Sequence, residues 1–186
     1  MSIPGRTVRL RAVEEADLPQ LQAWANDEAL WSNLGGWRFP TSFDSIRTWF
    51  AGLKSDPANL RLVIEALEGG ALLGTANLVD IDWKNRHATH GVMLGDPAMH
   101  GRGYGFDTVM AVMRYAFDEL NLERLDSDII EYNQPSYRLY VGKCGWTEEG
   151  RQRRWHFRQG RYWDKILIGV TRDDYAALAR SSGYWT

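Results

Sequence analysis

The chain has 186 residues, of which 44% are apolar, 25% are charged and nine are tryptophan. This composition is typical of a folded globular protein, excludes a disordered, collagen-like or coiled-coil chain, and at this length predicts one domain over residues 1–186. The formal net charge of −2, from 22 basic and 24 acidic side chains, provides no global field that would favour nucleic acid or an anionic membrane as a partner.

Cysteine content and hydrophobicity bear on the compartment. The single cysteine, Cys144, cannot form an internal disulfide, and no run of about 18 apolar residues could span a membrane. The first residues lack the apolar stretch of a signal peptide. We therefore expect a cytoplasmic protein without a membrane partner or a disulfide framework.

The N-terminal part of the chain predicts one strand and two helices. Residues 8–13 alternate apolar and basic side chains, which indicates a half-buried strand. Apolar residues then recur at helical spacing to about Leu30. A loop rich in glycine over residues 31–40 leads to a second helix over about 41–53, opened by a capping box that starts at Thr41.

The middle of the chain predicts the centre of a sheet. Residues 60–67 and 72–81 flank a glycine turn and predict an antiparallel hairpin, which residues 88–94 extend by a third strand. An apolar stripe at helical spacing predicts a helix over residues 104–120, and residues 124–130 predict the next strand. The helix connects strands 88–94 and 124–130 as a crossover, which makes these two strands parallel and the sheet mixed.

The C-terminal part predicts a short helix over residues 135–143 and a final hairpin with strands at 151–158 and 161–170. The predicted fold class is therefore α/β in the α+β sense, with a central, mostly antiparallel sheet and flanking helices.

The glycine-rich loop His100-Gly101-Arg102-Gly103-Tyr104-Gly105 lies between a predicted strand and a predicted helix. Such a junction directs backbone N–H groups and the helix dipole at one point, which suits a phosphate or pyrophosphate. The alternative is a flexible surface loop that only begins a helix. A Walker loop is excluded because no Gly-Lys-Ser/Thr follows, and the glycine spacing fits a dinucleotide fingerprint poorly, although Asp126 lies at a suitable distance.

Four separated motifs make residues 6–175 resemble a GNAT N-acetyltransferase of the RimJ/RimL-like branch. The resemblance implies a GNAT fold, in which strands 88–94 and 124–130 splay apart, and acetyl-CoA as cosubstrate without a metal. The motifs are Asp82-Trp83-Lys84-Asn85-Arg86, Gly101-Arg102-Gly103-Tyr104-Gly105, Asn133-x-x-Ser136-x-Arg138-Leu139-Tyr140 and Gly145-Trp146-x-x-Glu149-Gly150.

The resemblance also implies which residues bind the cofactor. Backbone N–H groups of the glycine loop would take the pyrophosphate, the end of the preceding strand would bind the pantetheine arm, and Asn133 would bind that arm or cap the following helix. His100 stands where the family has Gln or Arg. The complete expected set is Val92, Met93, Leu94, His100, Gly101, Arg102, Gly103, Tyr104, Gly105 and Asn133.

Catalytic groups are assigned in the same way. Tyr140 matches the family tyrosine that protonates the leaving thiolate, with a packed core aromatic as the alternative. The branch has Glu on the strand where this chain has Thr89, so the base is open, and Asp80 and Asp82 are the candidates. His90 lies on the opposite strand face from Thr89, which counts against it as the base.

Aromatic residues suggest the acceptor. Trp31, Trp37 and Trp83, together with Thr89, fall where the fold places the acceptor site, and carboxylates near them would suit a cationic amine. The alternative is that the tryptophans only fill the core. A basic, aromatic hairpin over residues 151–163 could stack on RNA, but a two-faced hairpin is the simpler interpretation, and a homodimer through it or an edge strand is a further hypothesis.

These observations favour an acetyl-CoA-dependent N-acetyltransferase acting on a primary amine: a protein N-terminal α-amine, a polyamine or another small cationic amine. Two alternatives stay open at this point. One is a non-catalytic CoA-binding module, because Thr89 replaces Glu, and the other is a dinucleotide-binding oxidoreductase.

Overall fold

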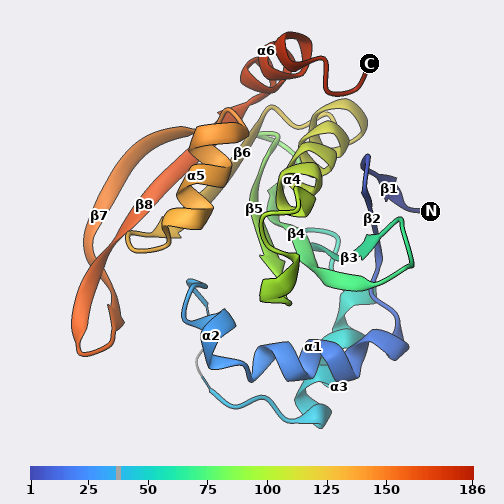
Figure 1. Ribbon diagram of the computed structural model, residues 1–186, viewed down its shortest axis with the longest axis vertical. Coiled ribbons are helices and arrows are strands. Elements are labelled where there is room, and N and C mark those ends of the chain that lie inside the picture. Colours follow the sequence, from blue (N-terminus) through green and yellow to red (C-terminus); the bar gives the residue numbers. More distant parts are fainter. Residues whose placement is uncertain (37–38) are drawn as a thin grey trace.

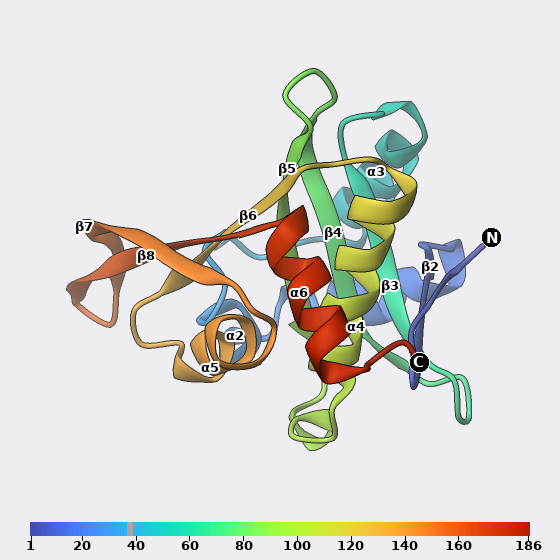
Figure 2. The ribbon, with the colours of Figure 1, turned by 90° about the horizontal axis from the view of Figure 1, so that it is seen from above.

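The computed structural model describes residues 1–36 and 39–186 and contains an eight-stranded mixed sheet in the order β1-β2-β3-β4-β5-β6-β8-β7 (Figures 1 and 2). Every neighbouring pair is antiparallel except β5 and β6, as predicted. The strands are β1 (Ile3–Pro4), β2 (Val8–Ala12), β3 (Leu60–Ala66), β4 (Leu72–Asp82), β5 (His87–Leu94), β6 (Arg124–Ile130), β7 (Thr147–Arg158) and β8 (Arg161–Thr171).

Helices cover the two faces of the sheet. The helices are α1 (Leu18–Ala25), α2 (Glu28–Trp31), α3 (Phe43–Gly52), α4 (Tyr104–Arg114), α5 (Gln134–Lys143) and α6 (Arg172–Ser182), and short 3-10 turns occupy Glu15–Asp17, Leu53–Ser55 and Pro97–Met99. Alternation along β3 divides the core, because Leu62 and Ile64 pack with α4 while Val63 between them packs with α1 and α3. None of the helices in the described ranges is long and apolar enough to cross a membrane.

Four predicted elements differ in detail from the structure, one of which is β7, which begins at Thr147 rather than at residue 151. The first helix is broken, because the Asp27 carboxylate accepts hydrogen bonds from the N–H groups of Ala29 and Leu30 and so begins α2 as a separate helix. The cap of α3 is Ser42, rather than Thr41. The long predicted helix ends as α4 at Arg114 and continues as a π-helical turn over Tyr115–Glu119.

The β5–β6 pair opens a gap in the sheet. The two strands are paired at only three positions, the last of which joins Thr89 to Asp126. Beyond Thr89, β5 continues to Leu94 with β4 as its partner, while β6 follows β8 away from it. The edge of β5 that faces β6 therefore has no strand partner among the described residues over its last residues, as the resemblance implied.

Asp107 on α4 joins distant parts of the chain and is 2% exposed. Its carboxylate accepts hydrogen bonds from the backbone N–H groups of Arg6, Thr7 and Val8 at 2.8, 2.6 and 2.9 Å. It also accepts from the Thr7 hydroxyl and, at 2.6 Å, from the Tyr184 hydroxyl beyond α6. Burial alone would raise the pKa of Asp107, but these hydrogen bonds outweigh it and hold that pKa below its ordinary value.

Candidate active site

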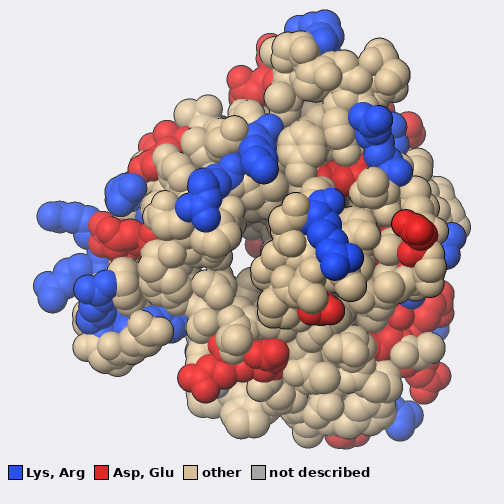
Figure 3. Space-filling model, viewed as in Figure 1, with Lys and Arg blue, Asp and Glu red and all other residues tan. Residues whose placement is uncertain are grey.

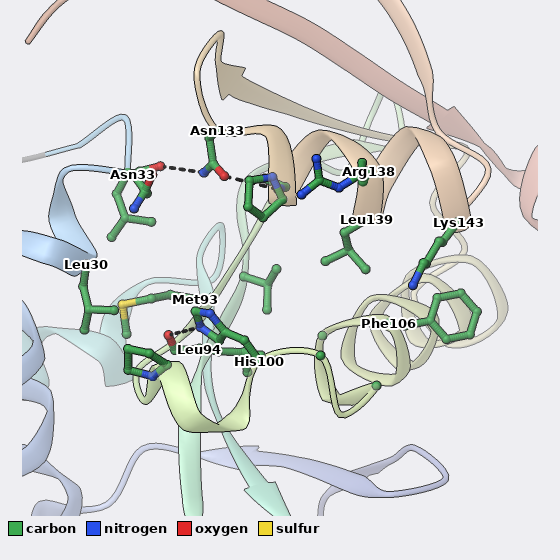
Figure 4. A pocket seen from close by; sticks show the side chains of 18 of the residues that line it. Leu30, Asn33, Met93, Leu94, His100, Phe106, Asn133, Arg138, Leu139 and Lys143 are labelled. Atoms are coloured by element: carbon green, nitrogen blue, oxygen red, sulfur yellow. Dashed lines mark hydrogen bonds between the residues drawn. The ribbon is translucent and has the colours of Figure 1, made fainter.

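A pocket of about 730 Å³ lies where the end of β5, the start of α4, helix α5 and helix α2 converge. The space-filling view shows a hollow in this region, with basic side chains above it and to its right and acidic side chains below it (Figure 3). In close view, side chains from these separate segments point toward one common space (Figure 4). The pocket occupies the side of β5 that the departing β6 leaves open.

The glycine loop gives α4 an unusual beginning. Gly101 and Gly103 have φ values of +75° and +89°, which residues other than glycine rarely adopt. No described atom lies within 4 Å of where a Cβ atom on either residue would be. Helices α2, α3, α5 and α6 each begin at a side chain that accepts a backbone N–H. No described side chain does so for α1, which continues the 3-10 turn Glu15–Asp17, or for α4, which follows the glycine loop. The first N–H groups of α4 are therefore available to an anion at the pocket.

Predicted cofactor residues come together here. Most of the predicted set lines the pocket, namely Val92, Met93, Leu94, His100, Gly101, Gly103, Gly105 and Asn133. Arg102 and Tyr104 of that set do not line it. The ring of His100 turns back toward the strand, with its Nε2 atom 3.5 Å from the Leu94 carbonyl oxygen (Figure 4).

Asn133 connects two walls of the pocket. Its side-chain oxygen accepts the backbone N–H of Ser136 and so caps α5, and its amide donates to the Asn33 carbonyl at 3.1 Å (Figure 4). The Tyr132 hydroxyl also donates to the Ser32 carbonyl. The segment after α2 is thereby tied to the start of α5, which fixes the width of the pocket.

Two cations of the pocket were not among the predicted site residues. Arg138 and Lys143 lie on α5 and line the pocket together with the glycine loop. Their positive charges face the same space as the uncapped start of α4, so the pocket suits an anionic ligand. Basic side chains on a short helix usually lie on its solvated face, so only the motif position of Arg138 marked it in the sequence.

Tyr140 lies next to the pocket in the core and does not line it. Its side chain is 3% exposed, and its ring packs against Trp146 and His90 with ring centroids 4.9 and 5.8 Å away. Burial, together with the neighbouring Cys144 thiol, raises the pKa of Tyr140. Helix α5 ends just after Tyr140, where the Cys144 N–H donates to the Leu139 carbonyl as well as to that of Tyr140.

The candidate bases lie at the other end of β5. Asp82 accepts hydrogen bonds from the N–H groups of Lys84 and Asn85 and from the Asn85 amide, at 3.0, 2.8 and 2.7 Å. The bonds from Asn85 hold the pKa of Asp82 below its ordinary value. Asp80, which has a φ of +53°, is exposed beside it. Neither carboxylate lines the pocket, and the contacts of Asp82 are those of a turn-stabilising residue.

The expected acceptor residues are more dispersed. Trp31 ends α2 and is partly buried, Trp83 is 53% exposed in the β4–β5 turn, and Thr89 occupies the last paired position of β5 and β6. None of these three lines the pocket. Trp37 lies outside the described residues.

Taken together, the pocket offers an uncapped helix start, two cations and a free strand edge. This combination fits a long ligand with phosphates at one end and an amide-containing arm at the other. The family model described as an acetyltransferase (GNAT) domain matches residues 7–147. The chain belongs to the GNAT family.

The sequence is similar to those of two bacterial N-acetyltransferases along nearly its whole length. The chain is 26% identical over 171 residues to the N-acetyltransferase YokL of the SPbeta prophage in Bacillus subtilis (strain 168), covering 92% of this chain and 93% of YokL. It is 25% identical to the N-acetyltransferase p20 of Bacillus licheniformis, covering 91% and 94%. The GNAT domain and these relatives identify the chain as an acyltransferase.

A solved GNAT structure resembles it closely in fold. The spermidine N-acetyltransferase of Vibrio cholerae, in complex with CoA and spermine, superposes with a TM-score of 0.84 at 26% identity. The match covers 91% of this chain and 98% of that protein. The splayed β5–β6 pair and the flanking helices are therefore those of the GNAT fold.

Proposed function

We propose that this GNAT enzyme transfers the acetyl group of acetyl-CoA to a primary amine, with a small cationic amine such as a polyamine as the favoured acceptor. The observation that carries the proposal is the uncapped start of α4, which faces a pocket with two cations and a free strand edge. Acetyl-CoA would supply an activated thioester. Protein N-terminal α-amines and other small amines belong to the same proposal, which follows the RimJ/RimL-like motifs of the sequence.

Each part of the pocket has a binding role in this proposal. Backbone N–H groups from Arg102 to Gly105 hold the pyrophosphate, and Arg138 and Lys143 contribute charge to the phosphates. Peptide groups of β5 over residues 92–94 bind the pantetheine amides in the manner of an added strand, because β6 leaves that edge unpaired. Tyr140 donates the proton that the leaving sulfur requires.

The acceptor must lose a proton before it attacks. An alkylamine with a pKa of about 10.4 is about 0.04% neutral at pH 7, which costs about 4.6 kcal/mol, whereas an α-amine near 7.8 costs about 1 kcal/mol. Thr89 supplies no carboxylate to share this cost. The spermine bound in the Vibrio cholerae structure supports an aliphatic polyamine as the acceptor. The lower cost of deprotonation supports an α-amine.

Acetyl transfer is tested with purified protein, acetyl-CoA and a panel of polyamines, amino sugars and short peptides, by following thiol release and the mass of the product. We expect turnover with at least one amine and a loss of about 100-fold in kcat in Tyr140→Phe, because the proton donor is removed. The KM for acetyl-CoA should stay within about twofold, because other residues hold the phosphates and the pantetheine arm.

Calorimetry distinguishes the alternatives. Binding of CoA with no turnover on any amine would indicate a non-catalytic binding module. Tight binding of NAD(H) without binding of CoA would instead favour the dinucleotide-binding oxidoreductase.

A further inference from the structure

Three aromatic side chains beside the pocket bury polar atoms that have no hydrogen-bond partner among the described residues. These atoms are Nε2 of His90, the hydroxyl of Tyr140 and Nε1 of Trp146. The residues are 1%, 3% and 2% exposed, and their ring centroids lie between 4.9 and 6.0 Å apart. Leaving one such atom unsatisfied costs about 1–3 kcal/mol, so three in one cluster require an explanation.

The tautomer of His90 follows from its other nitrogen. Nδ1 lies 2.8 Å from the backbone carbonyl oxygen of Asn77, which can only accept, so Nδ1 carries the proton. Burial lowers the pKa of His90 to about 4, although that hydrogen bond opposes the shift, and the ring is neutral at neutral pH. Nε2 therefore presents a lone pair, while Trp146 presents an N–H donor and Tyr140 can both donate and accept.

The cluster lies directly beyond the pocket on β5. His90 and Val92 share one face of the strand, and Val92 lines the pocket. Tyr140 follows Leu139, another lining residue, on α5. The cluster therefore sits between the pantetheine end of the pocket and the position at Thr89 where β5 and β6 separate.

We propose that His90, Tyr140 and Trp146 enclose one water molecule, which orients the Tyr140 hydroxyl toward the cofactor sulfur and makes His90 and Trp146 positioning residues for acetyl transfer. The inference rests on the proposed function, in which Tyr140 is the proton donor. Tyr140 and Trp146 belong to the four sequence motifs, whereas His90 belongs to none of them.

One water molecule gives each of the three groups a hydrogen-bond partner. The water accepts the indole N–H of Trp146, donates one hydrogen to His90 Nε2 and donates the other to the Tyr140 oxygen. The phenol hydrogen is then free to point at the sulfur. A phenol oxygen that accepts a hydrogen bond also stabilises the phenolate that forms.

The proton balance of the transfer is complete with this arrangement. As the C–N bond forms and the C–S bond breaks, the sulfur takes the phenol proton and the amine nitrogen loses one proton to solvent. The Tyr140 phenolate then recovers one proton from solvent after the thiol product has left. Cys144 is the other titratable group that acts on Tyr140, and burial raises the pKa of its thiol to about 12, so it stays protonated.

A double-mutant cycle separates this role from simple packing. His90→Asn keeps a donor near the Asn77 carbonyl but removes the Nε2 acceptor, and we expect kcat to fall about tenfold with the KM for acetyl-CoA unchanged. In a Tyr140→Phe background the same substitution should change kcat by less than about twofold, because His90 acts only through the phenol. Trp146→Phe, which removes the indole N–H and keeps an aromatic ring, should behave likewise. His90→Gln returns a polar atom near the Nε2 position and should recover part of the loss.

The water is observed directly by NMR on the wild-type protein, independently of turnover. The indole N–H resonance that disappears in Trp146→Phe should show a cross-peak to a long-lived water, which the exposed Trp83 and Trp155 should lack, and His90→Asn should abolish it. Nitrogen shifts should show His90 protonated at Nδ1 only.

Each outcome decides a separate point. Absence of the water cross-peak, or equal losses from His90→Asn with and without Tyr140, overturns the inference and leaves acetyl transfer standing. Wild-type protein without turnover on any amine overturns the proposed function, while the NMR result still decides the enclosed water.

Discussion

At the scale of single residues, Asp107 is the side chain whose removal should affect folding most specifically. Asp107→Ala leaves the N–H groups of Arg6, Thr7 and Val8 without their acceptor and releases Tyr184, so we expect the free energy of unfolding to fall by about 3 kcal/mol in urea titrations. Asp118→Ala, an exposed residue on the continuation of the same helix, should change it by less than about 0.5 kcal/mol. Equal effects of the two substitutions would contradict a special role for Asp107.

The residues of the pocket were predictable where a motif fixes a backbone conformation. Gly101 and Gly103 could be identified because a positive φ before a helix favours glycine, and the residues around them followed. Side-chain direction was not predictable in the same way. Arg102 lies between two lining glycines and still does not line the pocket, and the approach of Lys143 depends on how α5 packs, which a local pattern does not encode.

At the scale of elements, periodicity predicted the strands from β2 onward because each alternates between the two core clusters or faces solvent. Periodicity did not predict the break between α1 and α2, because the apolar spacing continues past Asp27. The carboxylate of Asp27 caps a new helix there in spite of that spacing. Periodicity also missed α6, which buries Tyr175 alone among its residues, although the capping box from Thr171 to Asp174 was a usable signal.

The start of α4 carries the element-scale prediction. Gly103→Ala places a side chain at a φ of +89°, with no neighbour for the new methyl group to strike, so the cost of about 1–2 kcal/mol comes from the backbone alone. We expect this substitution to shift the loop and weaken CoA binding at least tenfold in calorimetry. Gly142→Ala, at an unhindered helical position of α5, should stabilise the protein by about 0.5–1 kcal/mol and leave CoA binding unchanged. Equal loss of CoA binding in both variants would contradict a role for the loop conformation.

At the scale of the whole molecule, the gap between β5 and β6 is the feature that local sequence patterns specify least. Strands 88–94 and 124–130 each show an ordinary pattern, and nothing in either says that pairing stops after Thr89. The divergence arises because β6 stays in register with β8 along its full length while β5 stays with β4. Only the family resemblance predicted it, and the position of the pocket follows from it.

Buried His90 gives the stability of the whole fold a dependence on pH. Its pKa is about 4 in the folded protein and about 6.5 in an unfolded chain, so the unfolded state binds more protons between these values. Stability should therefore decline as the pH falls from 6.5 toward 4, by about 3 kcal/mol in total. Urea titrations across this range should show a flatter profile in His90→Asn, whereas the exposed His100→Asn should retain the wild-type slope. Parallel profiles for all three proteins would contradict this prediction.

The hydrogen bonds of Asp107 also constrain the order in which the fold can be completed during synthesis. The carboxylate of α4 can meet residues 6–8 as soon as the middle of the chain has been made, but its bond to Tyr184 spans 77 residues and must wait until nearly all of this sequence has been translated. Until then, α4 and the first strands can associate only with an incomplete set of hydrogen bonds. A nascent chain halted before Tyr184 should accordingly be more sensitive to protease than one that includes Tyr184, even though every lining residue of the cofactor pocket is already present.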